Sequence, residues 1–187
     1  KKQQKNDEKR ANRYNYKFKN ILMLSEWMME SPEDLDEYLL LPCPKGVRIS
    51  LVLGERESSH TCEAYYKNGM HFFDIKTNLP HDTILDCVFW KGTKTIYVLD
   101  VLMYAGRDLV NCDTEFRRFW LKSKFAEEKL QAYSHEIKLK IIDDYDFSNS
   151  HVVYECFQKY PTFDDGALLD GFLFYHKKSS YTFGTTP

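Results

Sequence analysis

Short apolar runs, separated by polar and turn-forming residues, recur through the middle of the chain and predict β-strands. The two longest runs, Thr83–Trp90 and Thr95–Met103, are separated by Lys91-Gly92-Thr93-Lys94, which is typical of a hairpin turn. The remaining predicted strands are Tyr38–Leu41, Val47–Leu53, Met70–Phe73, Lys138–Ile142 and Phe172–His176.

Helical spacing of apolar residues is confined to fewer segments. It predicts a short helix between Asn20 and Met29, where apolar residues recur on one face. The segment Ser31-Pro32-Glu33-Asp34-Leu35 then resembles a helix cap followed by a first turn. One long helix is predicted from Asp113 to Leu130, and a helical turn at Tyr154–Phe157. This mixture predicts an α+β fold in which antiparallel sheets surround a cleft.

Composition narrows the class of protein. A length of 187 residues favours one domain with a substantial core, and an apolar content of 43% argues against a disordered chain. No apolar stretch approaches the roughly 18–20 residues of a membrane helix, and the N-terminus does not resemble a signal sequence. The five cysteines form no Cys-x-x-Cys pair. We therefore expect reduced thiols, no zinc site and no membrane association.

Charge is distributed unevenly along the chain. The net charge of −2 argues against a protein that grips long nucleic acid through many phosphates. Residues 1–20 carry eight Lys or Arg against two acidic residues, which leaves a net charge of −8 on the remainder. The sequence thus predicts a basic flexible tail at 1–20 and one domain at 21–187. The tail could instead be an arm that contacts RNA.

One motif carries a specific chemical signal. Residues 43–48, Cys-Pro-Lys-Gly-Val-Arg, resemble the Lys-x-Asp-Gly-x-Arg box of RNA capping enzymes and ATP-dependent ligases, with cysteine replacing the first lysine. In those enzymes this lysine becomes covalently attached to the nucleotide, which glycine and arginine cannot do. Leu85–Phe89 resembles a second motif, with Val88 replacing a glutamate that supports the metal-bound nucleotide. The resemblance implies a pocket that binds a nucleotide without reacting.

Several segments in the correct order narrow the resemblance to the snurportin family. They are Leu22–Trp27, Cys43-Pro44, Tyr65–Gly69, Asp82–Cys87, Tyr97–Val101 and Asp170–Lys177, within a match that extends from about Ile21 to Pro187. Members of this family recognise the 2,2,7-trimethylguanosine cap of spliceosomal small nuclear RNAs and bring them into the nucleus. The resemblance implies the fold of the nucleotidyltransferase domain of mRNA capping enzymes, no enzymatic activity and no cofactor.

The same resemblance implies partners and a location. The partners would be the trimethylguanosine-capped small nuclear RNA or its ribonucleoprotein, together with importin-β and an exportin. By this resemblance the tail at 1–20 could be the end of an importin-binding segment. The protein would shuttle between cytoplasm and nucleus. A monomer is expected, because the sequence shows no heptad pattern or apolar stripe that would suggest an oligomer.

The chemistry of the cap selects the candidate site residues. N7-methylated guanine is a flat cation, which favours an electron-rich aromatic face, and two N2 methyl groups require an apolar wall. The resemblance assigns cap contacts to Leu24, Ser25, Trp27, Cys43, Arg48, Lys67 and Val88. Spacing alone would instead make Trp27 a core residue of the predicted helix. Trp90 and Trp120 are expected in the core, whereas Arg48 and Lys67 would hold the cap phosphates or ribose.

Two alternatives and one departure accompany this interpretation. The chain could be a protein-interaction domain with a degenerate nucleotidyltransferase fold, or a residual guanylyltransferase that uses Lys45 instead of the missing lysine. In the snurportin family a tryptophan that stacks on the methylguanine follows the Thr-Pro pair matched by Thr186-Pro187. The sequence ends there, so we expect that tryptophan to be absent and the cap affinity to be weaker by roughly ten- to a hundredfold.

Overall fold

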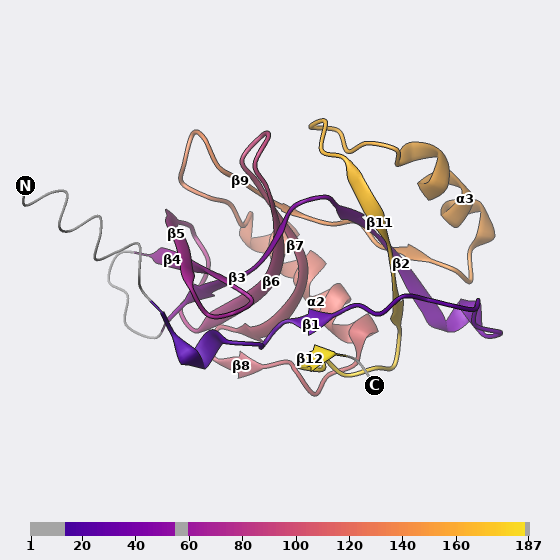
Figure 1. The fold of residues 1–187 in the computed structure, drawn as a ribbon, viewed down its shortest axis with the longest axis horizontal. Coiled ribbons are helices and arrows are strands. Elements are labelled where there is room, and N and C mark those ends of the chain that lie inside the picture. The colour runs from indigo at the N-terminus through magenta and orange to yellow at the C-terminus, as the bar shows by residue number, and fades with distance from the viewer. Residues whose placement is uncertain (1–13, 55–59, 186–187) are drawn as a thin grey trace, which may run out of the picture.

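A computed structural model describes residues 14–54 and 60–185, which contain one large β-sheet, one small sheet and a short strand pair (Figure 1). The large sheet has the strand order β5-β4-β3-β6-β7-β8, and β9 pairs in parallel with β7. Its strands are β3 (Val47–Leu53), β4 (Thr61–Tyr66), β5 (His71–Lys76), β6 (Thr83–Trp90), β7 (Thr95–Tyr104), β8 (Arg107–Asp108) and β9 (Lys138–Ile141).

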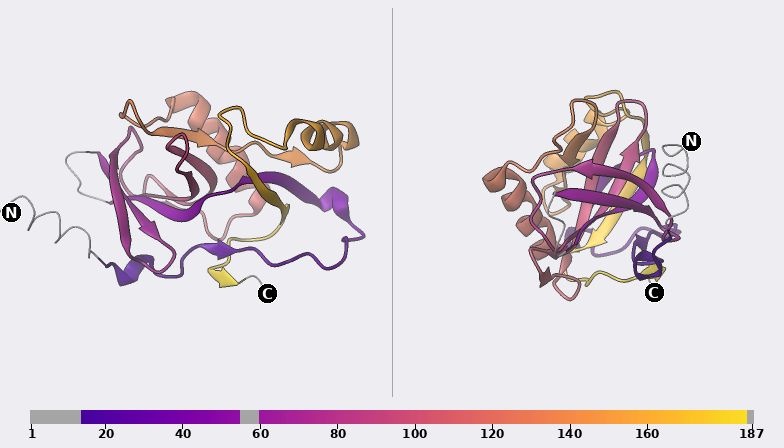
Figure 2. Two further views of the ribbon diagram at one scale, coloured as in Figure 1. Left: turned by 45° about the horizontal axis from the view of Figure 1, so that its top comes forward. Right: turned by 90° about the vertical axis from the view of Figure 1, so that its left-hand side faces the viewer.

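The small sheet stands beside the large one and has the order β10-β2-β11. It comprises β2 (Tyr38–Pro44), β10 (Tyr145–Asp146) and β11 (Leu169–His176). The parallel strand pair joins β1 (Met23–Leu24) to β12 (Gly184–Thr185), near opposite ends of the described chain. The helices are α2 (Thr114–Glu128), α3 (Ser150–Lys159) and the 3-10 turns η1 (Tyr16–Phe18) and η2 (Leu35–Glu37). Figure 2 shows α2 and β1 on opposite sides of the large sheet.

Both faces of the large sheet are buried, each in its own core. Successive side chains of a strand point to opposite faces, so Leu85 and Cys87 of β6 enter the core beneath α2. Val88 instead enters the core shared with the small sheet and α3, beside Tyr97 and Leu99 of β7. This arrangement explains the nearly continuous apolar runs of β6 and β7, and it confirms the predicted α+β fold.

The long predicted helix forms, but its buried face is unexpected. Asp113 caps α2 by accepting a hydrogen bond from the Phe116 N–H at 2.8 Å. Phe116 and Phe119 are 43% and 65% exposed, whereas the side chains of Arg117 and Arg118 are buried. Each buried guanidinium is paired with a carboxylate, Arg117 with Asp100 and Arg118 with Asp144. These ion pairs orient the helix against the sheet.

The short helix predicted between Asn20 and Met29 is wrong. The segment is extended, and Met23–Leu24 pairs with β12. Neighbouring residues Leu22 and Met23 are buried, at 1% and 9% exposure, whereas Trp27, which the helical spacing placed on the apolar face, is 93% exposed. Tertiary hydrogen bonds take the backbone groups of Met23, so contacts distant in sequence override the local spacing. The predicted cap and first turn at 31–35 form no α-helix either; the 3-10 turn η2 begins at the last residue of that segment, Leu35.

Strand predictions were more successful. β3 and β6 have the predicted bounds, and β2, β5, β7, β9 and β11 differ from theirs by a few residues. The hairpin turn at 91–94 is present, and the predicted turn at Tyr154–Phe157 lies inside α3. β4 was not predicted, because Thr61 and Glu63 interrupt its apolar pattern.

The predicted N-terminal tail falls only in part within the described residues. Of the predicted tail at 1–20, residues 1–13 lie outside the described residues. Residues 14–20 pack on the β4–β5 hairpin: Phe18 contacts Tyr65, with ring centroids 4.9 Å apart, and the Asn20 N–H donates to the Lys67 carbonyl at 2.8 Å. Residues 14–20 therefore pack against the domain. No helix in the described part of the chain is long and apolar enough to cross a membrane.

Candidate functional site

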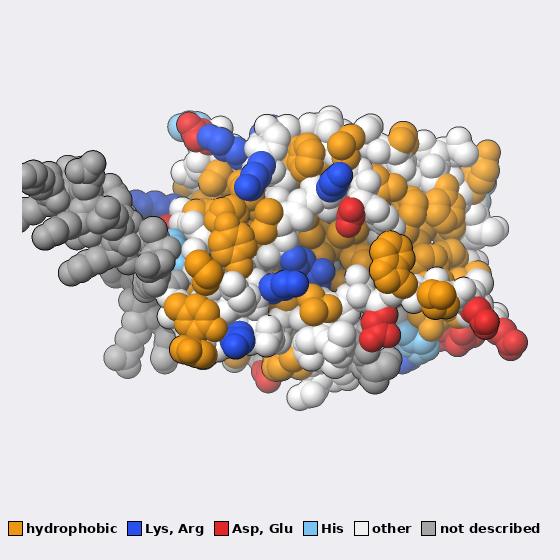
Figure 3. Space-filling model, in the orientation of Figure 1, with side chains coloured by type: hydrophobic (Ala, Val, Ile, Leu, Met, Phe, Trp, Pro, Cys, Tyr) orange, Lys and Arg blue, Asp and Glu red, His pale blue; other side chains and the backbone are white. Residues whose placement is uncertain are grey.

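A cleft of about 840 Å³ opens between the small sheet and the segment that begins at β1. We call this segment, Met23–Met28, the strap. Six of the seven predicted site residues line the cleft: Leu24, Ser25, Trp27, Cys43, Arg48 and Val88. In Figure 3 hydrophobic side chains gather on the same face, over β2 and β11. The cleft is large enough for a nucleotide, since ligand pockets occupy about 300–1,000 Å³.

The strap supplies the aromatic and polar side chains of one wall. It runs without helix or strand structure from Ser25 onward, and Ser25, Glu26 and Trp27 are exposed. Trp27 is 93% exposed, so it is not the core residue that spacing alone suggested. Such an indole offers an open face on which a flat cation can stack.

The floor of the cleft is formed by the turn between β2 and β3, which lies directly on β6. Gly46 makes this close approach possible, because a Cβ there would lie 2.5 Å from the Phe89 carbonyl oxygen and 2.8 Å from Val88 Cγ1. Cys43 and Val88 give the floor a weakly polar and an apolar surface. Burial raises the pKa of the Cys43 thiol to about 11, although Arg48 opposes the rise. Cys43 is therefore a neutral thiol near pH 7.

Arg48 faces the cleft, and its guanidinium is also hydrogen-bonded to other parts of the protein. Its Nε and Nη2 donate to the two carboxylate oxygens of Asp86, at 2.6 and 2.7 Å, and Nη2 also donates to the Met23 carbonyl at 3.0 Å. Burial would lower the pKa of Arg48, but the Asp86 carboxylate outweighs it and raises the pKa. Among the described residues that line the cleft, Arg48 is the sole Lys or Arg.

The opposite wall is the free edge of β11. The Lys177 N–H donates to the Glu37 carbonyl at 2.8 Å, and the register places His176 opposite Tyr38. Because hydrogen-bonded and non-hydrogen-bonded pairs alternate, Phe172 and Phe174 fall in the second kind. Their N–H and C=O groups therefore point away from β2, and no described strand pairs with that edge. These peptide groups are available to a ligand in the cleft.

Lys67 is the predicted site residue that the structure leaves outside. It lies exposed in the turn after β4 and does not line the cleft. Lys45, the alternative nucleophile, is also exposed and absent from the lining. Trp90 and Trp120 are half-buried against the two cores, as expected.

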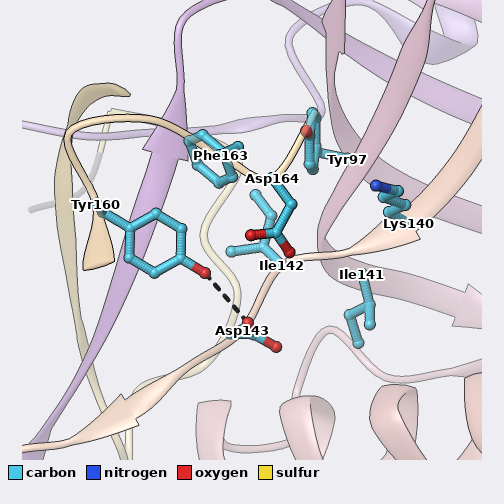
Figure 4. A pocket seen from close by; sticks show the side chains of 8 residues that line it. All are labelled: Tyr97, Lys140, Ile141, Ile142, Asp143, Tyr160, Phe163 and Asp164. Atoms are coloured by element: carbon cyan, nitrogen blue, oxygen red, sulfur yellow. Dashed lines mark hydrogen bonds between the residues drawn. The ribbon is translucent and has the colours of Figure 1, made fainter. Parts of the chain in front are cut away.

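A second hollow is too small for a nucleotide. Its volume of about 70 Å³ would hold roughly two water molecules. Figure 4 shows Tyr160 at its edge, donating to Asp143 at 3.1 Å, with Asp164 and Lys140 nearby. Its polar groups are thus partly occupied by one another, and the larger cleft is the candidate site.

Sequence reasoning missed several residues that line the cleft or hold its lining in place. Asp86 stands in the motif around Val88, but nothing in the sequence indicated that its carboxylate holds Arg48. Tyr181 donates to Asp86 at 2.7 Å across 95 positions, a separation that no local pattern reveals. Glu26 and Asp170 add carboxylates to the lining, which suits a cationic ligand.

Solved structures share the fold at low identity. Mycobacterial DNA ligase D complexed with ATP and MES matches with a TM-score of 0.60 and 12% identity, over 89% of this chain and 57% of that chain. The ligase domain from M. tuberculosis LigD matches with a TM-score of 0.59 and 10% identity, over 93% and 58%. The chain thus spans less than two thirds of these ligase chains. At such identity the likeness shows the fold alone.

A family model gives a more specific result. The model of the Snurportin1 m3G cap-binding domain matches residues 21–187, which is most of the chain. The matched range includes the strap, the β2–β3 turn, β6 and β11, and therefore every wall of the cleft. The chain belongs to the Snurportin1 m3G cap-binding domain family.

Proposed function

We propose that this chain binds the 2,2,7-trimethylguanosine cap of small nuclear RNAs in the cleft and does not react with it. The observation that carries the proposal is the convergence of Ser25, Trp27, Cys43, Arg48 and Val88 on one cleft within the matched family domain. These residues come from three separate parts of the sequence. Their convergence supports one shared ligand better than the alternative of a domain with the fold and no ligand.

The cleft has groups suited to each part of the cap. The exposed indole of Trp27 can stack on the cationic base, and the carboxylates of Glu26 and Asp170 favour its positive charge. Val88 and Cys43 offer an apolar surface for the two N2 methyl groups. Arg48 and the free N–H groups of β11 can donate to phosphate, ribose or base oxygens.

The absence of catalysis is part of the proposal. Cys43 stands where related enzymes carry the nucleophilic lysine, and its raised pKa keeps the thiol protonated near pH 7. Val88 stands where they carry a glutamate, so a hard-cation ligand is replaced by an apolar side chain. The solved ligase structures support the shared fold but not a shared activity.

The cellular role rests on family membership. We propose that the protein is an adaptor for nuclear import of capped small nuclear ribonucleoproteins, with importin-β and an exportin as partners. It would act as a monomer and move between cytoplasm and nucleus. The cleft itself supports only recognition of the cap.

A titration with cap analogues tests the proposed function. Burial of two N2 methyl groups contributes roughly 0.8 kcal/mol each, so the trimethyl cap should bind about ten- to twentyfold more tightly than the monomethyl cap. Both dissociation constants can be measured by fluorescence titration with cap dinucleotides, using unmethylated GpppG as a control. Equal affinity for the two methylated caps would contradict trimethyl-cap recognition, and no binding of either would favour a domain without a nucleotide ligand.

A further inference from the structure

A network centred on Asp86 attaches the strap to the body of the protein at Met23. The Met23 N–H donates to the Tyr181 hydroxyl oxygen at 2.8 Å, and the Met23 carbonyl accepts from Arg48 Nη2 at 3.0 Å. The two side chains that contact Met23 also donate to the buried Asp86 carboxylate. Arg48 donates through two nitrogens, and Tyr181 donates through its hydroxyl at 2.7 Å. Both polar backbone groups of Met23 therefore depend, through one intermediary each, on Asp86.

Tyr181 is itself held from the side of the core. It is 3% exposed, and its backbone N–H donates to the Val110 carbonyl at 2.9 Å. Its ring lies 5.6 Å from the guanidinium carbon of Arg117, which is anchored in the core by Asp100. Burial and the nearby Asp86 carboxylate raise the pKa of Tyr181. Its hydroxyl thus remains a donor to Asp86 and a fixed acceptor for Met23.

Few other bonds hold the strap. The parallel pair of β1 with β12 is two residues long, and its neighbouring bond joins the Gly184 N–H to the Leu22 carbonyl at 3.1 Å. From Ser25 to Met28 the side chains are exposed. The apolar spacing of this segment favours a helix, which would turn Trp27 to a different direction. The hydrogen bonds of Met23 oppose that alternative.

We propose that Asp86 and Tyr181 are positioning residues for ligand recognition: they fix the strap in its extended form and so present Ser25 and Trp27 to the cleft. The inference rests on the proposed function, because it assigns these residues to the same cap-binding site. It does not require either side chain to touch the cap. Neither Asp86 nor Tyr181 belonged to the site predicted from the sequence.

The first test removes the hydroxyl oxygen of Tyr181 and measures the hydrogen exchange of the strap amides in the absence of ligand. In Tyr181→Phe, the Met23 amide loses its acceptor, so its hydrogen exchange should become roughly tenfold faster. The matched control is Tyr104→Phe, since Tyr104 is buried and donates to Glu128 at 2.6 Å, away from the cleft lining. Exchange of amides in β6 and β7 reports whether any acceleration is global. Asp86→Asn provides a second variant, in which the network loses the negative charge of the carboxylate.

The second measurement is the affinity for the trimethylguanosine cap dinucleotide. Tyr181→Phe should weaken binding by roughly five- to tenfold, and Tyr104→Phe should leave it unchanged. Since Tyr181 acts through the strap, its effect should largely disappear in a Trp27→Ala background, so that the two losses do not add.

The outcomes separate this inference from the proposed function. Faster exchange confined to the strap together with weaker cap binding supports the inference. Unchanged exchange at Met23 in both Tyr181→Phe and Asp86→Asn overturns it, as does a loosened strap with undiminished cap affinity. If the unaltered protein binds no cap while Tyr181→Phe loosens the strap, the proposed function fails and the positioning of the strap stands.

Discussion

Two buried aspartates lie opposite each other on neighbouring strands and have different surroundings. Asp86 of β6 is in register with Asp100 of β7, a placement in which like charges repel. Each carboxylate is neutralised by its own arginine, Asp86 by Arg48 and Asp100 by Arg117. The side chain of Arg48 is 20% exposed and faces the cleft, whereas Arg117 is fully buried.

The difference shows that the same kind of ion pair, an aspartate with an arginine, serves two purposes in this molecule. Arg117 comes from α2, donates twice to Asp100 at 3.0 Å, and also bonds the Cys112 carbonyl at 2.6 Å, so its pair joins helix to sheet. Arg48 comes from β3, and besides its two bonds to Asp86 it donates a third to the Met23 carbonyl in the strap. We therefore expect the Asp100 pair to control folding stability and the Asp86 network to control the cleft.

The largest effect should follow from breaking the core pair. Arg117→Ala leaves Asp100 buried and unpaired, opposite Asp86, and should reduce the free energy of unfolding by about 3–5 kcal/mol. Urea denaturation followed by circular dichroism measures the change. This loss is a large fraction of the roughly 5–15 kcal/mol that stabilises a typical domain.

A double substitution provides the control for this prediction. Replacing both partners, Asp100→Leu with Arg117→Met, removes the unpaired charge and should recover much of the lost stability. A loss below about 1 kcal/mol in Arg117→Ala would show that the core pair contributes no more than an exposed ion pair. The proposed contrast with Asp86 would then fail.

The contrast also shows what the sequence could reveal. Apolar runs in the sequence located most strands. A strand that is buried on both faces, such as β6 or β7, consists of nearly continuous apolar residues, and such a run can be recognised locally. The same reasoning indicated α2 but not its orientation, since Phe116 is exposed while Arg117 and Arg118 are buried. Only the positions of Asp100 and Asp144 in space account for that inversion.

The candidate site divides in the same way. Cys43, Arg48 and Val88 could be predicted, because they belong to short motifs that resemble a known family. The extended strap could not, because its backbone partners, Tyr181 and Arg48, lie far from Met23 in the sequence. The cap-contacting roles of these residues, and that of Lys67, stay predictions.

A smaller effect is expected from the exposed side of the cleft. Trp27→Ala should weaken binding of the trimethyl cap by about 1–3 kcal/mol, the contribution of one base–aromatic stack, as measured by titration. Its unfolding free energy should change by less than about 0.5 kcal/mol, because a 93% exposed side chain contributes little to packing. The expectation for Arg117→Ala is the reverse, since its main effect is on the free energy of unfolding.

Met29 offers the matched control for Trp27. It is 89% exposed, lies two residues further along the chain and does not line the cleft. Met29→Ala should therefore leave both cap affinity and stability unchanged. Undiminished cap binding in Trp27→Ala would remove the stacking role from the strap and would also weaken the case for its positioning by Tyr181.

The smallest expected effect is none, and it concerns the lost nucleophile. Cys43→Lys restores the lysine of the resembling enzymes, yet we expect no covalent nucleotide adduct, because Val88 still occupies the place of the metal-supporting glutamate. Incubation with α-labelled GTP or ATP and magnesium, followed by denaturing electrophoresis, detects an adduct. The unaltered protein serves as the control; label on it would point to Lys45 and to a residual transferase. Label on Cys43→Lys alone would mean that the cleft still supports the metal-bound nucleotide without the glutamate, so that one substitution at position 43 separates binding from catalysis.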